Sequence, residues 1–275
     1  MSIDFSSLID LWSYAFFYKA VFVGVLISFL LSWLGAYVVL RREVIFADAI
    51  SNIAFFGVAL AFFFDSSISI FILGSCFVAG LIVHYLQSKH ILQSDSLLEI
   101  LAQTGLALAV VIISLLTGYK ADLSQFLFGD LLGLSTNDLW ITVVLFVALS
   151  LVLFLGHRNF VRVSLSNYLS QSVIKNKEFW NLFFVILLAI SIGLAIKIVG
   201  VLLVAAFTTI PANIAKLLVN TLKRTFVLSV ILGVVLTFLG IHLSALLNVP
   251  SGATIVLVMV VALIMALAKR SLKFD

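Results

Sequence analysis

The chain has 275 residues, of which 64% are hydrophobic and 10% charged, and its formal net charge is +4. Because soluble domains carry about 25% charged residues, this composition excludes a soluble globular protein and predicts an all-α polytopic membrane protein. A transmembrane β-barrel is excluded, since its strands alternate between apolar and polar residues and lack long apolar runs. The single cysteine, Cys76, excludes an internal disulfide.

Apolar runs of roughly 17–25 residues are long enough to cross a bilayer, and they predict about nine transmembrane helices, with a count of eight left open. The runs lie near residues 16–40, 45–64, 68–86, 97–117, 138–156, 179–197, 200–219, 226–247 and 252–268. Ile198-Val199-Gly200 is only a weak break between the sixth and seventh runs. Residues 1–15 predict a short interfacial segment, and residues 1–275 are expected to form one transmembrane domain.

Basic residues fall overwhelmingly on one side of these spans, and the positive-inside rule makes that side cytoplasmic. The other side carries only Lys19, Lys120 and Lys197 of the sixteen lysines and arginines. With nine spans, the C-terminus is predicted to be cytoplasmic and the N-terminus outside. The positive net charge is interpreted as this orientation signal, and no nucleic-acid partner is expected.

Two connecting loops differ from the others. In the outer loop 118–138, the apolar stretch from Phe126 to Leu132 predicts a short helix that dips into the outer surface. The inner loop 157–178 places apolar residues near helical spacing, with Ser164 or Ser166 as N-cap. Those apolar residues are Val163, Leu165, Tyr168, Leu169 and Val173. They predict either a docking surface for a partner or an ordinary surface helix.

Asp48 is the first acidic residue inside a predicted span, where a charge costs about 2.5–3.5 kcal/mol on insertion scales. Asn52 follows at i+4 on the same helix face, with Ser51 beside it. Their oxygen atoms are suited to transient coordination of a divalent cation. The alternative is that Asp48 only forms an ion pair with Arg41 or Arg42 at the inner interface, and both interpretations stay open.

Other polar residues in the spans are fewer. Glu99 is interpreted as an acid at a helix N-terminus, and Gln103, on the same face at i+4, as a candidate for a central pathway. Pro211, with Thr208, Thr209 and Asn213 around it, indicates either a packing kink or a break at a transport path. The four histidines do not cluster, and there is no Walker A sequence, so neither a metalloenzyme nor an ATPase is expected.

Four stretches of the chain resemble the membrane subunit of the bacterial metal-ion ABC importers, the family of the zinc-uptake permease and its manganese and iron relatives. They are Gly35 to Leu60, which contains Asp48; Phe126 to Gly133, most similar to the zinc branch; Lys197 to Val204 with Ile210-Pro211-Ala212 and Lys223-Arg224; and Val249 to Leu257. Their order and spacing cover nearly the whole chain. The resemblance implies the ABC permease fold of metal-ion and vitamin importers.

The resemblance also implies a function and partners. Two copies would form the pathway in a bacterial inner membrane, two ATPase subunits would bind loop 157–178, and an external binding protein would deliver the metal. No resident cofactor is implied. The substrate expected first is zinc, with manganese or ferrous iron as alternative substrates. The alternative function is that of a non-transporting assembly or sensor subunit. The expected metal residues are Asp48, Asn52, Ser51 and Gln103.

This chain departs from the family pattern at three positions and in its coupling segment, where residues 167–173 stand in place of an alanine- and arginine-rich stretch. Asn52 replaces the histidine that follows the family's aspartate by one helical turn, and Gln103 stands where zinc-type members can carry a histidine. Ala253 replaces a proline. Because an amide oxygen is a harder and weaker ligand than imidazole, the expected metal site is altered, looser or completed by other residues.

Overall fold

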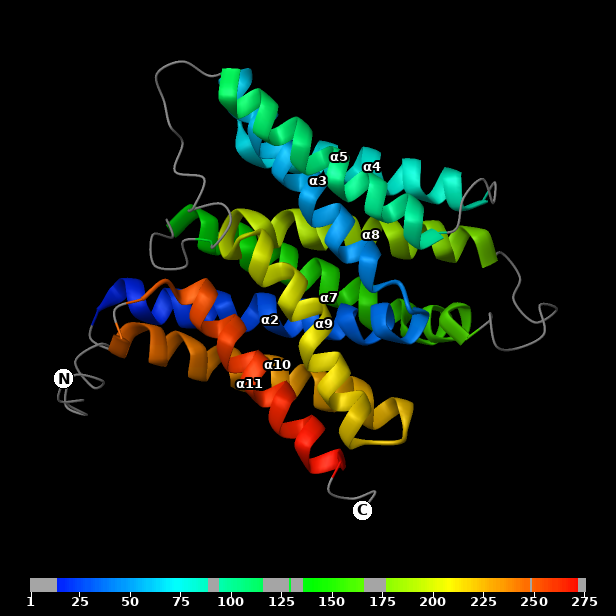
Figure 1. Ribbon diagram of the computed structural model, residues 1–275, viewed down its shortest axis with the longest axis vertical. Helices are drawn as coiled ribbons and strands as arrows, with labels where there is room; N and C mark the ends of the chain where they lie inside the picture. Colours follow the sequence, from blue (N-terminus) through cyan, green and yellow to red (C-terminus); the bar gives the residue numbers. More distant parts are fainter. Residues whose placement is uncertain are drawn as a thin grey trace. The chain divides into compact units, whose positions relative to one another are not determined.

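The computed structural model of the chain describes residues 14–88, 94–115, 129, 136–165, 177–247 and 249–271, and all regular structure among them is helical (Figure 1). The helices are α2 (Ala15–Arg41), α3 (Val44–Phe63), α4 (Ile68–Ser88), α5 (Ser94–Leu115), α7 (Thr136–Leu165), α8 (Lys177–Val199), α9 (Val201–Leu218), α10 (Leu222–Leu247) and α11 (Ser251–Ser271). Each is long and apolar enough to cross a bilayer.

These helices confirm the predicted spans over the part of the chain that the structure describes. The largest difference is at α7, which continues to Leu165, nine residues past the predicted end of its span, so the first part of the expected inner loop is helical. Ser164 is therefore not an N-cap, and its Oγ instead donates to the Phe160 carbonyl one turn back. The expected interfacial segment, apart from its last residues, and the short helix from Phe126 to Leu132, apart from Gly129, lie outside the described residues.

The weak break at Gly200 is confirmed, because α8 ends and α9 begins on either side of it. Gly200 has φ 86° and ψ 159°, a conformation that is essentially restricted to glycine. Gly129, also at positive φ (74°), packs against this break: a Cβ there would lie 2.8 Å from the Gly200 nitrogen. Two separate stretches of the family resemblance therefore meet through glycines.

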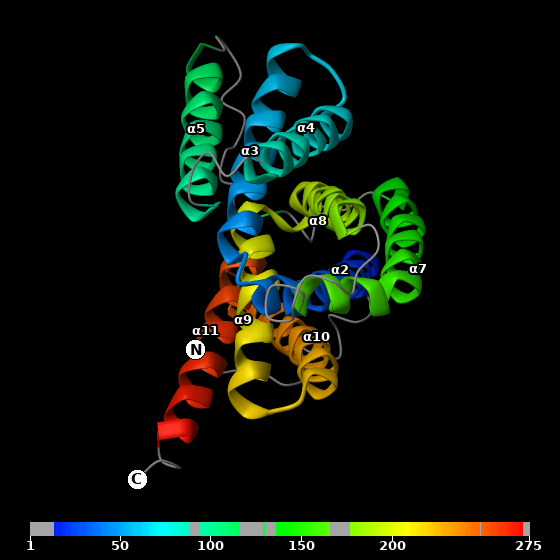
Figure 2. The same cartoon turned by 90° about the vertical axis from the view of Figure 1, so that its right-hand side faces the viewer.

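The chain divides into two compact units. The second contains residues 37–126 and 149–197, and within it α3 packs against α4 and α5, as Figures 1 and 2 show. Small residues permit these approaches, because backbones come close where side chains are absent. A Cβ on Gly105 of α5 would lie 3.1 Å from the Ile53 Cα of α3, and one on Gly57 of α3 would lie 2.8 Å from the Phe71 carbonyl oxygen of α4.

The first unit contains residues 1–36, 127–148 and 198–275, in which α9, α10 and α11 pack against one another. Hydrogen bonds of uncharged hydroxyl groups join α10 to the first part of α2. Ser229 Oγ donates to the Ser32 carbonyl at 2.9 Å, and Thr237 Oγ1 donates to Ser28 Oγ at 2.9 Å. Such interhelical hydrogen bonds contribute roughly 0.6–2 kcal/mol each in a membrane protein.

The proline-containing stretch of α9 is a packing feature, since the helix continues through Pro211. Proline has no N–H, so the Phe207 carbonyl loses its helical donor. Ser32 Oγ approaches this carbonyl at a long 3.5 Å, which supplies a replacement donor from α2. Thr209 Oγ1 donates to the Ala205 carbonyl at 2.8 Å, so its hydroxyl is satisfied within the helix.

Candidate functional site

The turn between α2 and α3 sets the positions of the charged residues. Glu43 N–H donates to the Val38 carbonyl at 3.0 Å and Arg42 N–H to the Val39 carbonyl at 3.3 Å, the hydrogen-bond pair of a Schellman motif. Arg42 occupies the left-handed position of this motif at φ 61°, where glycine is usual. The turn is so short that α3 begins at Val44, directly after Glu43.

Arg41, the last residue of α2, points into the second unit, and its side chain is only 4% exposed. Its Nε donates to Ser164 Oγ of α7 at 2.9 Å, and its Nη1 donates to Asn181 Oδ1 of α8 at 2.7 Å. Glu43 forms a loose ion pair with it at 3.8 Å. The guanidinium also lies over the Phe184 ring, 3.9 Å from its centroid. One arginine therefore ties the cytoplasmic ends of three helices together.

An aromatic cluster surrounds this arginine. Tyr37, fully buried on α2, hydrogen-bonds through its hydroxyl to His157 Nδ1 of α7. Its ring meets those of Phe160 and Phe184 edge-on, at centroid separations of 6.0 and 5.8 Å. Each such aromatic pair contributes about 0.5–1.5 kcal/mol beyond its buried area. His157 thus has a structural partner in the second unit.

Asp48 lies about 6 Å along the axis from the start of α3, and it is exposed. Among the described residues Arg41 forms its ion pair with Glu43 and not with Asp48, whose carboxylate is acted on by the charge of Glu99. Asn52 is partly exposed one turn further on, whereas Ser51 is fully buried and donates to the Ala47 carbonyl at 2.8 Å. The hydroxyl of Ser51 is committed to its own helix.

Glu99 is a residue whose role sequence reasoning missed. Because α5 begins at Ser94, Glu99 is its sixth residue and not an acid of the first turn, so that interpretation was wrong. It lies close enough to Asp48 for the two carboxylates to repel each other. The signal was present in the sequence: Glu99 and Gln103 repeat, at the start of another span, the i, i+4 carboxylate–amide spacing of Asp48 and Asn52.

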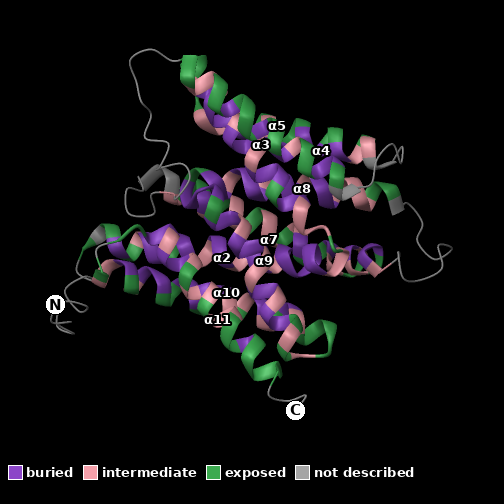
Figure 3. Ribbon diagram, viewed as in Figure 1, coloured by how far each residue is buried: buried purple, intermediate pink, exposed green. Residues whose placement is uncertain are grey.

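The packing of α3 and α5 brings the two pairs together. The helices run in the same direction with α4 returning between them along the chain (Figure 1), and they touch where Gly105 meets Ile53. Gln103 Nε2 donates to Glu99 Oε1 at 3.0 Å, and both side chains are exposed on α5, much of whose surface is exposed in Figure 3. Two carboxylates and two amides therefore lie at the starts of neighbouring spans.

The sequence profile of the ABC 3 transport family matches residues 13–270. The chain belongs to the ABC 3 transport family. Its members are membrane subunits of ABC-type importers, and this chain is an ABC permease with multiple spans in the bacterial inner membrane. As an ABC permease it implies an ATPase partner and a substrate-binding protein.

Relatives in this family carry names for more than one metal. The manganese transport system membrane protein MntC of Halalkalibacterium halodurans is 29% identical over 249 residues, which is 90% of this chain and 85% of that protein. The high-affinity zinc uptake system membrane protein ZnuB of Haemophilus influenzae is 29% identical over 254 residues, 92% of this chain and 97% of that protein. The family is therefore that of metal importers, with both metals represented.

A solved structure has the same fold. PsaBC from Streptococcus pneumoniae, in complex with Fab, superposes with a TM-score of 0.83 at 26% identity, covering 95% of this chain and 94% of that one. An inward-facing metal-chelate type ABC transporter gives 0.74 at 15% identity, covering 91% and 85%, which supports the fold alone. The predicted permease fold is confirmed by these likenesses.

The described residues contain no cluster of three or more His, Cys, Asp or Glu side chains that could hold a metal ion. The four side chains on α3 and α5 offer carboxylate and amide oxygens but no nitrogen or sulfur ligand, a donor set suited to hard cations. Of the expected docking residues, Val163 is buried at the end of α7, Leu165 is partly exposed, and Tyr168, Leu169 and Val173 lie outside the described residues. Their role stays a prediction.

Replacing Arg41 tests how much its contacts stabilise the second unit. We expect Arg41→Ala to lower the free energy of unfolding by about 3 kcal/mol, because Ser164, Asn181 and Glu43 lose a shared buried partner. The measurement is a titration of the purified full-length protein from mild detergent into SDS. Arg158→Ala, which removes an exposed arginine of α7, is the control and should change stability by less than about 0.5 kcal/mol. An equal loss of unfolding free energy in Arg41→Ala and Arg158→Ala would contradict a special stabilising role for the contacts of Arg41.

Proposed function

We propose that this permease moves a divalent metal ion into the cytoplasm, and that the ion passes the carboxylate–amide pairs Asp48–Asn52 and Glu99–Gln103. The observation that carries the proposal is the packing of α3 against α5, with Gly105 at Ile53, which places the exposed carboxylates of Asp48 and Glu99 near the starts of two parallel spans. Two exposed carboxylates that repel each other inside membrane spans are costly. A passing dication removes that cost because it neutralises both charges at once.

Manganese is the metal that this donor set supports best. Carboxylate and carbonyl oxygens suit Mn²⁺, whereas imidazole and thiolate ligands are the ones that favour zinc. Asn52 and Gln103 supply amide oxygens at two positions where the family resemblance expects histidine. The Mn-named relatives are consistent with this choice.

Zinc is the second candidate. It is favoured by the resemblance of the stretch from Phe126 to Gly133 to the zinc branch and by the likeness to ZnuB, which has the same identity as the likeness to MntC. A weak oxygen site does not exclude zinc passage, since a transit ligand needs only to lower the barrier and not to hold the ion. Ferrous iron has intermediate ligand preferences and no specific observation here favours it.

We also propose that a second copy of the chain covers the polar face of α3 and α5. Asp48, Glu99 and Gln103 are exposed, and lipid cannot satisfy charged or amide groups in the hydrocarbon region. A homodimer would place two such faces opposite each other and enclose a polar pathway. The surface of α7 where Leu151 and Phe154 are exposed is apolar and is suited to lipid instead.

Energy for transport would come from a separate ATPase subunit, because the sequence has no Walker A motif of its own. The connection between α7 and α8 is the proposed docking segment on the cytoplasmic side. Arg41 would transmit its movement, since the guanidinium contacts α7 and α8 at the ends from which that connection leaves. A binding protein outside would deliver the metal.

Uptake of radioactive manganese tests the proposed pathway. Removing either charge should leave the dication with less compensation, so we expect Asp48→Asn and Glu99→Gln each to lower uptake by about ten-fold or more, on the order of 1.4 kcal/mol of barrier. The matched control is Asp65→Asn at the other end of α3, where asparagine tolerates the φ of 48°. Normal uptake in both pathway variants, with normal assembly, would favour a non-transporting subunit.

Cysteine cross-linking tests the proposed dimer. In a Cys76→Ala background, Gln103→Cys places a thiol on the polar face of α5, and we expect an oxidant to produce a covalently linked dimer in native membranes. Leu151→Cys on the apolar face of α7 is the control and should remain monomeric. Cross-linking of Leu151→Cys alone would place the interface on α7 and reject the polar-face dimer.

A further inference from the structure

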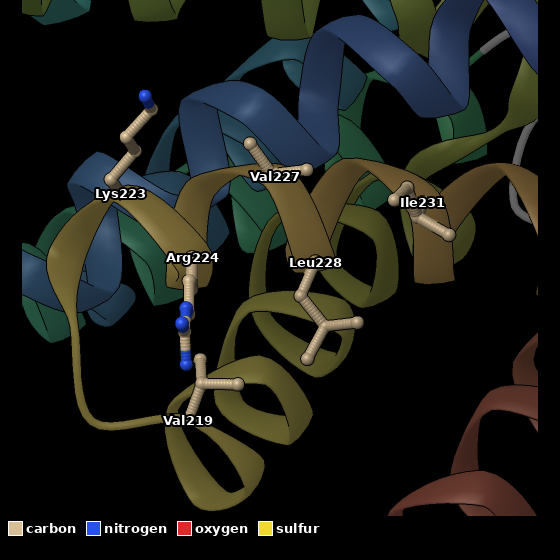
Figure 4. Close-up of a pocket in the computed structure, with 6 residues that line it drawn as sticks. All are labelled: Val219, Lys223, Arg224, Val227, Leu228 and Ile231. Carbon is tan, nitrogen blue, oxygen red and sulfur yellow. The ribbon is translucent and has the colours of Figure 1, made fainter.

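A groove lies beside the turn between α9 and α10, in a different unit from the residues of the proposed metal pathway. It has a volume of about 450 Å³ and belongs wholly to the first unit (Figure 4). Its lining residues are Val219, Lys223, Arg224, Val227, Leu228 and Ile231. Four are aliphatic, and the two charged ones are both cations at the cytoplasmic end of α10.

The two cations have no counter-charge among the residues that the structure describes. Neither Lys223 nor Arg224 forms an ion pair or a side-chain hydrogen bond with any described residue, and both are exposed. Arg224 extends toward Val219, while Lys223 extends to the other side of the α10 backbone (Figure 4). They lie in the first turn of α10, which contains no acidic residue, so the helix dipole adds to their positive potential and does not compensate it.

Apolar surface leads from these cations toward the membrane interior. Val227, Ile231 and Val235 follow at i+4 intervals on α10 and are 53%, 51% and 47% exposed. From Arg224 to Val235 the helix rises by about 16 Å, close to the thickness of one leaflet of a hydrocarbon core of about 30 Å. A ligand that fits this surface has an anionic head and an apolar tail of one-leaflet length.

We propose that this groove binds the anionic phospholipid of the inner leaflet, with the headgroup phosphate held by Arg224, the charge of Lys223 adding to the positive potential from the other side of the α10 backbone, and an acyl chain along Val227 and Ile231. Charge complementarity identifies the occupant, because a zwitterionic lipid adds an ammonium cation of its own and leaves the net charge of the groove uncompensated, and an apolar protein helix brings no anion. Basic residues near a membrane surface attract anionic lipid by about 1 kcal/mol each. The lipid would fix the cytoplasmic end of α10.

Native mass spectrometry of the full-length chain, purified with its ATPase subunit, tests the proposal with phosphatidylglycerol and phosphatidylcholine of identical chains. The two cations together should give a preference for phosphatidylglycerol of about 30-fold. Lys223→Gln/Arg224→Gln should abolish that preference. The control Lys269→Gln/Arg270→Gln removes two exposed cations from the last turn of α11, where the helix dipole compensates them, and should retain it.

A second variant separates the groove from the charge. Val227→Trp fills the apolar part and leaves both cations in place, so it should also reduce retention of phosphatidylglycerol by about ten-fold, the loss expected from excluding several methylene groups. An equal loss in the α11 control would reduce the effect to general surface charge and overturn the proposal. Loss of the ATPase subunit from Lys223→Gln/Arg224→Gln, with lipid retention unchanged, would overturn it in favour of a protein interface.

Discussion

Hydrocarbon offers no partner to a charged side chain, and this constraint explains how the charges of the chain are placed. Arg41 meets it by burial among partners: a hydroxyl, an amide oxygen, a carboxylate and an aromatic face all lie against its guanidinium. Asp48 and Glu99 do the opposite, since they are exposed and repel each other. The buried contacts of Arg41 hold helices together, whereas the exposed carboxylates of Asp48 and Glu99 are suited to contact a passing cation.

The short turn between α2 and α3 couples these two arrangements. Arg41 ends one helix, Arg42 takes the left-handed position, and Asp48 follows within the first turns of the next helix. We infer that a movement of the cytoplasmic ends of α7 and α8 would reach Asp48 through Arg41 and this short turn. This is a mechanical connection between the proposed docking segment and the proposed metal path, built from residues adjacent in the sequence.

The sequence predicted the helices well because hydrophobic length alone determines which segments can span a bilayer. It predicted the break at Gly200 but not the contact with Gly129, since packing between distant segments leaves no periodic signal. From the sequence, Pro211 was compatible with either a packing kink or a break in the helix. The structure shows a continuous helix, in which the Ser32 hydroxyl of α2 approaches the Phe207 carbonyl that Pro211 leaves without a donor. The interpretation of Glu99 as a first-turn acid was wrong because α5 begins before the apolar run. The interpretation of Ser164 as an N-cap was wrong because α7 continues past its apolar run. Hydrophobicity alone does not determine either helix boundary.

The central claim is that a hard, all-oxygen set of ligands on α3 and α5 contacts the ion in transit and favours manganese over zinc. Competition between manganese and zinc for uptake, compared in the natural chain and in Asn52→His, tests it most directly. An imidazole in place of the amide should shift the preference toward zinc by about ten-fold or more, as a softer ligand requires. An unchanged ratio in a variant that still transports would contradict contact between this helix turn and the ion.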